Sequence, residues 1–99
     1  DMEERYRLII STILNAIGCQ VEVEHMLSTG RIDIVASTSR FIYVMELKLA
    51  NNGGINAAEK QMIDNGYLKP FLADGRKVIG LAVELDDMGK GLIDWKEVK

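Results

Sequence analysis

Two acidic residues and a lysine stand on neighbouring predicted strands at a spacing that could build a catalytic site. Asp33 lies in the segment Arg-Ile-Asp-Ile-Val-Ala-Ser at 31–37. Glu46 and Lys48 lie in the apolar segment at 40–49, with one residue between them. Side chains alternate between the two faces of a strand, so Glu46 and Lys48 share a face. A carboxylate beside an ammonium on an otherwise apolar face is suited to binding a cation and to stabilising charge on a phosphate.

A short hairpin between the two strands predicts that Asp33 joins this face. A two-residue loop at 38–39 makes Asp33 the diagonal neighbour of Glu46, roughly 7–8 Å away at the backbone. A four-residue loop leaves the same side chains on this face, whereas a three-residue loop would reverse them. In the Asp33 strand, strict alternation places Ile32 and Ile34 together on the other face.

This arrangement points to metal-dependent hydrolysis of a phosphodiester. Two carboxylates and a backbone carbonyl suit Mg²⁺, which binds oxygen ligands at about 2.1 Å and retains several waters. The cation would polarise the phosphodiester and lower the pKa of water. A lysine two residues after the second carboxylate would orient the attacking water or stabilise the transition state.

The rest of the sequence predicts elements that hold these strands. An apolar stripe at helical spacing over 3–17 predicts an amphipathic helix that ends at Gly18. We expect strands at 20–27, 31–37 and 40–49, a helix at 55–72 with Pro70 near its end, a strand at 77–84 and a short edge strand at 92–98. The crossover helix makes the fourth strand parallel to an earlier one. The predicted fold class is α/β, with a mixed central sheet flanked by helices in the order αβββαβ.

The composition fits one small domain but raises one objection to nucleic-acid binding. The chain has 99 residues, 47% of them hydrophobic, which is enough for a core. The apolar segments are too short to cross a membrane, no secretory leader is evident, and the lone Cys19 fits a reducing cytoplasm. The chain begins Asp1-Met2, and we expect a single domain over 1–99 cut from the C-terminal part of a longer protein. The net charge of −3 argues against binding a phosphate backbone.

Several ordered motifs resemble one known group of proteins. Gly30-Arg31-Ile32-Asp33, a hairpin and Glu46-Leu47-Lys48 resemble the PD-(D/E)XK nuclease superfamily, although Ile32 stands where the name of the superfamily places proline. The match is closest to the nuclease-like domain at the C-terminus of AAA-ATPase-like bacterial proteins. It rests on Val-Glu-Val-Glu at 21–24, Thr-Gly-Arg-Ile-Asp at 29–33, residues 43–49, Ala57-Ala58 with Gln61, Tyr67, and Ile-Asp-Trp-Lys at 93–96.

The resemblance implies a role for each matching position. Asp33 and Glu46 match the metal-binding carboxylates, the Leu47 carbonyl matches the backbone ligand, and Lys48 matches the catalytic lysine. The implied cofactor is Mg²⁺, for which Mn²⁺ substitutes. The implied fold is a restriction-endonuclease-like core.

Three further residues are weaker candidates. By resemblance, Gln61 on the second helix matches a glutamine beside the site, and Glu3 matches an acidic residue of the first helix that contributes to the metal site. Arg31 is a candidate nucleic-acid contact. Each has a plainer interpretation, since helical glutamines and strand arginines are usually solvated and helix starts attract acids.

Two functions remain open from the sequence. The first is a metal-dependent nuclease that cleaves nucleic acid, with DNA favoured by resemblance, alone or as a homodimer that cuts two strands. The second is a catalytically weak or inactive interaction module that serves an attached ATPase-like domain. The intact Asp33, Glu46 and Lys48 set favours the first, and the acidic charge and small size favour the second.

Overall fold

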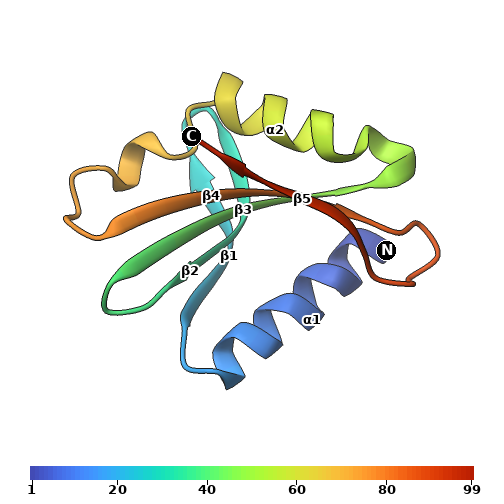
Figure 1. Cartoon of the computed structure of the whole chain (residues 1–99), viewed down its shortest axis with the longest axis horizontal. Coiled ribbons are helices and arrows are strands. Elements are labelled where there is room, and N and C mark those ends of the chain that lie inside the picture. Colours follow the sequence, from blue (N-terminus) through green and yellow to red (C-terminus); the bar gives the residue numbers. More distant parts are fainter.

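The computed structural model describes all residues 1–99 as a five-stranded sheet with one helix on each face (Figure 1). The elements in chain order are α1 (Met2–Ala16), β1 (Gln20–Leu27), β2 (Gly30–Ser37), β3 (Phe41–Leu49), a 3₁₀ turn (Ala50–Asn52), α2 (Gly54–Asp64), a second 3₁₀ turn (Lys69–Phe71), β4 (Lys77–Leu85) and β5 (Leu92–Val98). The predicted α/β class, the order αβββαβ and the added last strand are therefore confirmed.

The strand order is β1-β2-β3-β4-β5, so β3 is central as its apolar sequence predicted. Neighbouring strands are antiparallel except for β3 and β4, which are parallel and joined through α2. A parallel pair needs a crossover of this kind, and the helix packs on the sheet as it returns. None of the helices has the length and apolar character needed to cross a membrane.

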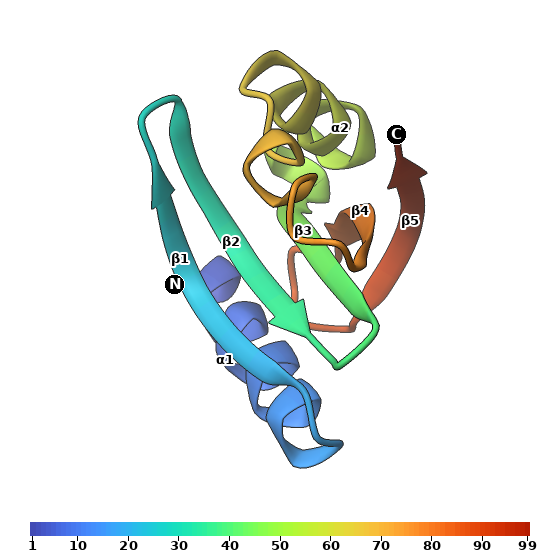
Figure 2. The ribbon, with the colours of Figure 1, turned by 90° about the vertical axis from the view of Figure 1, so that its left-hand side faces the viewer.

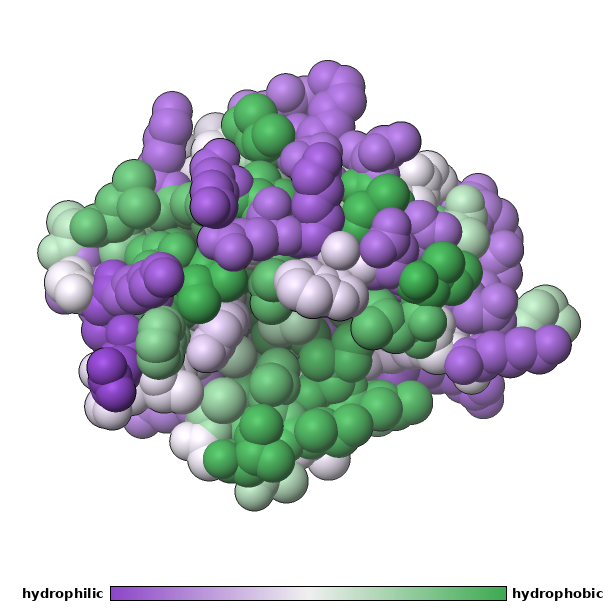
Figure 3. All heavy atoms as spheres, in the orientation of Figure 1, coloured by the Kyte–Doolittle hydropathy of each residue, from purple (hydrophilic) through white to green (hydrophobic).

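Helix α1 begins at a capping box and packs only part of its apolar stripe on the sheet. The Asp1 side chain accepts a hydrogen bond from the Glu4 backbone N–H at 2.8 Å. Tyr6, Ile10 and Leu14 contribute to the core, while three other stripe residues, Ile9, Ile13 and Ile17, are more than half exposed. Together with β4 and β5, α1 borders an apolar groove of about 520 Å³. Figure 3 shows apolar side chains gathered over this part of the molecule.

Helix α2 ends earlier than the sequence predicted. It stops at Asp64 rather than at 72, because Gly66 adopts a left-handed φ of 61° and reverses the chain. The backbone N–H of Tyr67 then donates to the Met62 carbonyl at 3.0 Å, which closes the helix end. Tyr67 is fully buried as a result, and Pro70 lies in the separate 3₁₀ turn.

The β2–β3 hairpin has a four-residue turn and a register two residues from the one predicted. Ser37 pairs with Ile42 and Val35 with Val44, so the two-residue loop and the diagonal relation of Asp33 to Glu46 were wrong. The Thr38 backbone N–H donates to the Phe41 carbonyl, and the Thr38 hydroxyl accepts from the N–H groups of residues 40 and 41. Within the paired part of the ladder, from Ile34 to Ser37, a shift of two preserves which side chains share a face.

Strict alternation breaks in β2 around Asp33. Ile34 packs in the core cluster on the α1 side with Tyr6, whereas Ile32 packs in the cluster on the α2 side with Met62, and both isoleucines are fully buried. The prediction that Ile32 and Ile34 share a face was therefore wrong. The local cause lies across the ladder, where Glu24 of β1 has φ 54° and interrupts the pairing between Val23 and His25.

Candidate active site

The candidate site lies in a fork where β2 and β3 separate. Their pairing ends at Ile34 and Met45, one residue before Asp33 and Glu46 would face each other. Beyond this point the β1–β2 hairpin diverges from β3, as Figure 2 shows. The Asp33 carboxylate occupies the gap, where its Oδ2 accepts the Leu47 backbone N–H at 2.8 Å. A side chain thus replaces the missing ladder partner and fixes Asp33 against β3.

Asp33 and Glu46 form a pair of buried acids, with exposed fractions of 5% and 2%. Burial raises the pKa of Asp33, an effect opposed by the Leu47 N–H and by the positive charges of Arg7 and Lys48. Burial, and then the negative charge of Asp33, raise the pKa of Glu46 to about 8. Two acids this close cannot both be ionised cheaply, so the pair retains a proton near neutral pH unless a cation compensates its charge.

Lys48 lies beyond Glu46 on the same face of β3 and is half-buried. Its positive charge acts to lower the pKa of both Asp33 and Glu46. The neighbouring residue on β4 is Glu84, whose Oε1 accepts the Ile55 backbone N–H at 2.8 Å at the start of α2. Sequence reasoning missed Glu84, although its alternation within β4 places it on the face of Lys48.

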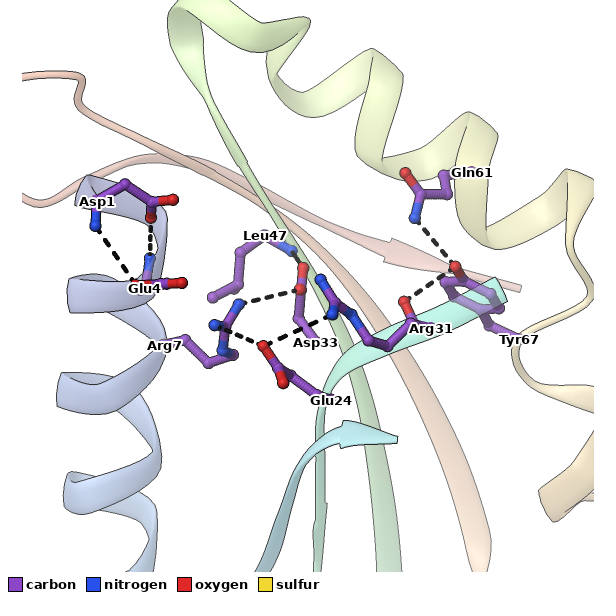
Figure 4. A network of polar contacts seen from close by, with 9 residues as sticks. All are labelled: Asp1, Glu4, Arg7, Glu24, Arg31, Asp33, Leu47, Gln61 and Tyr67. Atoms are coloured by element: carbon purple, nitrogen blue, oxygen red, sulfur yellow. Dashed lines mark hydrogen bonds and ion pairs between the residues drawn. The ribbon is translucent and has the colours of Figure 1, made fainter. Parts of the chain in front are cut away.

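Arg7 and Glu24 also lie at the fork, and sequence reasoning missed both. Arg7 of α1 places Nη2 2.8 Å from Glu24 Oε1 and Nη1 3.8 Å from Asp33 Oδ1. Arg31, half-exposed, places Nη1 3.8 Å from the same Glu24 oxygen. Figure 4 shows the two arginines on either side of Glu24, beside Asp33. The sequence did hold a signal for Arg7: it directly follows Tyr6, a residue of the apolar helical stripe that packs on the sheet.

The structure does not bring Gln61 and Glu3 into contact with the acid pair. The Gln61 amide donates to the Tyr67 hydroxyl at 3.0 Å, and that hydroxyl donates to the Arg31 carbonyl at 3.0 Å (Figure 4). Gln61 is therefore linked to the start of β2 through Tyr67. Glu3 lies one turn before Arg7 on α1, and its side chain makes no hydrogen bond or ion pair within the chain.

The donor set of the fork fits a hard divalent cation. Glu46 Oε1 is buried and has no hydrogen-bond partner, which is costly for a carboxylate oxygen unless a cation satisfies it. No group of three or more His, Cys, Asp or Glu side chains is present that could enclose a metal. Two carboxylates, with the Leu47 carbonyl beside them in sequence, leave coordination positions for water, as Mg²⁺ prefers.

Comparisons with known proteins agree with this geometry. The sequence pattern of the PD-(D/E)XK nuclease superfamily matches residues 1–95. The chain belongs to this superfamily. It is also 26% identical over 93 residues to a protein of Azotobacter chroococcum mcd 1 named "Uncharacterized protein in vnfD 5'region". The matching region covers 94% of this chain and 18% of the relative, so the chain spans about a fifth of that protein.

Proposed function

We propose that this domain is a metal-dependent nuclease that hydrolyses phosphodiester bonds of nucleic acid, with DNA as substrate and Mg²⁺ or Mn²⁺ as cofactor. The observation that carries the proposal is the buried Asp33–Glu46 pair, in which Glu46 Oε1 lacks a partner. Membership of a nuclease superfamily supports the reaction class. The choice of DNA rests on resemblance.

Each residue of the fork has a distinct role in this proposal. Asp33 and Glu46, together with the Leu47 carbonyl, hold the cation, which when bound supplies positive charge that polarises the phosphodiester and acidifies water. Lys48 orients the attacking water and stabilises the charge that develops on the phosphate. Gln61 acts through Tyr67, because their hydrogen bond leads to the carbonyl of Arg31 on the Asp33 strand.

We also propose that the domain works as the C-terminal part of a longer cytoplasmic protein with an ATPase-like domain. The resemblance to AAA-ATPase-associated nuclease-like domains supports this context, as does the greater length of the relative. A larger protein would also supply basic surface that this chain, with a net charge of −3, lacks.

The first experiment is a calorimetric titration of the metal-free domain with Mn²⁺ and with Mg²⁺. Wild type should bind at one or more sites, Asp33→Ala should lose binding, and Lys48→Ala should retain it. Cleavage of plasmid and single-stranded DNA is then measured for the same three proteins. Wild type should cleave, and both variants should be inactive. Asp33→Ala should be inactive because it no longer binds the metal, and Lys48→Ala because the attacking water and the charge on the phosphate lose their lysine.

The outcomes separate the nuclease from the interaction module. A folded wild-type domain that neither binds the metals nor cleaves DNA would refute the nuclease proposal and favour a module that retains only the fold. Equal cleavage by wild type and Lys48→Ala would remove Lys48 from the mechanism. Circular dichroism of each variant checks that the fold is intact.

A further inference from the structure

Arg7 is a nearly buried cation that reaches from α1 into the fork. Its side chain is 13% exposed and forms ion pairs with two carboxylates, Glu24 at 2.8 Å and Asp33 at 3.8 Å. A guanidinium has five N–H donors, and two of the nitrogens of Arg7, Nη1 and Nη2, face these carboxylates. Arg7 therefore keeps donor capacity beside the candidate catalytic acids. Arg5, on the same helix, is exposed and has no ion pair.

Glu24, the partner of Arg7, has an unusual backbone conformation. It is the only non-glycine residue with a positive φ, at 54°, and it lies within a strand. A residue with a Cβ disfavours this region, and such strain persists where the surroundings impose it, often at functional sites. Here Oε1 of Glu24 forms an ion pair with Arg7 at 2.8 Å and lies 3.8 Å from Arg31. The strained residue thus places one carboxylate between two arginines at the mouth of the fork.

The contact between Arg7 and Asp33 is weaker than the contact with Glu24 and involves a particular oxygen. Asp33 Oδ2 already accepts the Leu47 N–H, whereas Arg7 approaches Oδ1 at 3.8 Å. Oδ1 is therefore the oxygen that Asp33 has left for a cation. If a cation takes it, the guanidinium keeps Glu24 as its anchor and has donors free for an anion next to the acid pair. A planar guanidinium is well matched to phosphate oxygens.

We propose that Arg7 binds a nucleic-acid phosphate beside the Asp33–Glu46 pair, and that Glu24 is the positioning residue that holds its guanidinium there. The inference rests on the proposed function, because it assumes a phosphodiester substrate at this pair. Arg7, Arg31 and Lys48 place three positive charges at the fork, beside the carboxylates of Glu24, Asp33 and Glu46.

The test measures binding of a short labelled oligonucleotide, single-stranded and duplex, by fluorescence anisotropy over a series of salt concentrations. Ca²⁺ replaces Mg²⁺, because its longer bonds to oxygen polarise water less and leave the substrate intact. Arg7→Gln should weaken binding about tenfold and reduce the slope of log affinity against log salt by about one phosphate contact. Arg5→Gln, which removes the same charge from the outer side of α1, should change the slope little. Arg7→Lys should recover only part of the affinity.

The role of Glu24 is tested against another glutamate of the same strand. Glu24→Gln and Glu22→Gln each remove one negative charge, which alone would strengthen binding to a polyanion. Glu22→Gln should bind as tightly as wild type or more tightly, whereas Glu24→Gln should bind more weakly. In the Arg7→Gln background Glu24→Gln should no longer weaken binding and should instead act as Glu22→Gln does, because the residue that Glu24 positions is already gone.

The outcomes distinguish this inference from the proposed function. Calorimetry of Arg7→Gln should show metal affinity equal to or above that of wild type, because a competing cation has been removed. If wild type binds metal and oligonucleotide, and Arg7→Gln matches Arg5→Gln in affinity and slope, the phosphate contact is refuted while the nuclease proposal stands. If Arg7→Gln loses metal binding instead, Arg7 serves the acid pair and the inference also fails. A wild type that binds no metal refutes the proposed function itself.

Discussion

The buried acid pair should make the stability of the metal-free domain depend strongly on pH, and Glu46→Gln should remove that dependence. In the folded protein the pKa of Glu46 is raised from 4.5 to about 8, mainly by burial and then by the charge of Asp33. Between about pH 5 and about pH 8 the folded chain therefore keeps a proton that the unfolded chain has lost. The free energy of unfolding must fall as pH rises through this range.

The expected magnitude follows from about 1.4 kcal/mol per pKa unit. Over the three pH units between about pH 5 and about pH 8, the free energy of unfolding should therefore fall by about 4 kcal/mol. This is a large part of the stability of a small domain. Glutamine has nearly the same shape as protonated glutamate, and its amide is a potential donor to Asp33. The variant should therefore show little pH dependence and be more stable than wild type at pH 8.

The assay is urea unfolding followed by circular dichroism in EDTA across this pH range. Glu97→Gln, an exposed change on β5, is the matched control and should keep the wild-type slope. Adding Mg²⁺ at pH 8 should stabilise wild type by about 2.7 kcal/mol at a hundredfold excess over the dissociation constant, and Glu46→Gln hardly at all. A wild-type stability that is flat over the range in EDTA, or an unchanged slope in Glu46→Gln, would refute the reasoning.

Three further predictions concern the residues that support the fork. Tyr67→Phe removes the hydroxyl that donates to the Arg31 carbonyl and should lower the free energy of unfolding by about 1–3 kcal/mol in urea titrations. Gly54→Ala should destabilise the domain by about 1–3 kcal/mol in the same assay, because the new Cβ would lie 2.5 Å from Glu84 Oε1 at a left-handed φ of 60°. Glu24→Gly relieves the strain at φ 54° and should leave the thermal midpoint near that of wild type while oligonucleotide affinity falls; a parallel loss of both would show that Glu24 serves stability alone.

The sequence allowed the fold class, the element order and the central position of β3 to be predicted, because hydrophobic periodicity reports directly which segments are buried. The sharing of a face by Glu46 and Lys48 followed from simple alternation. The end of α2 was missed because Gly66 stops the helix through its backbone conformation, before Pro70 is reached. Loop length was missed as well, since Thr38 stabilises a four-residue turn through its side chain.

The fork itself was beyond prediction from one sequence. Alternation assumes a regular ladder, whereas here Glu24 leaves extended geometry in β1 and Asp33 takes a backbone donor of β3 as its partner. Both residues form ion pairs with Arg7, which is far away in sequence and reaches the hairpin from α1. Contacts of this kind arise from tertiary structure and leave no periodic signal.

Leu47 links the hydrophobic core of the domain to the position of the buried acid pair. Its side chain is fully buried against the α1-side core, while its neighbours in sequence, Glu46 and Lys48, project from the other face of β3. Packing of the Leu47 side chain in the core therefore fixes β3 at the point from which Glu46 and Lys48 project. A change of shape at Leu47 would consequently displace both the Glu46 side chain next to it and the backbone N–H that Asp33 accepts at 2.8 Å.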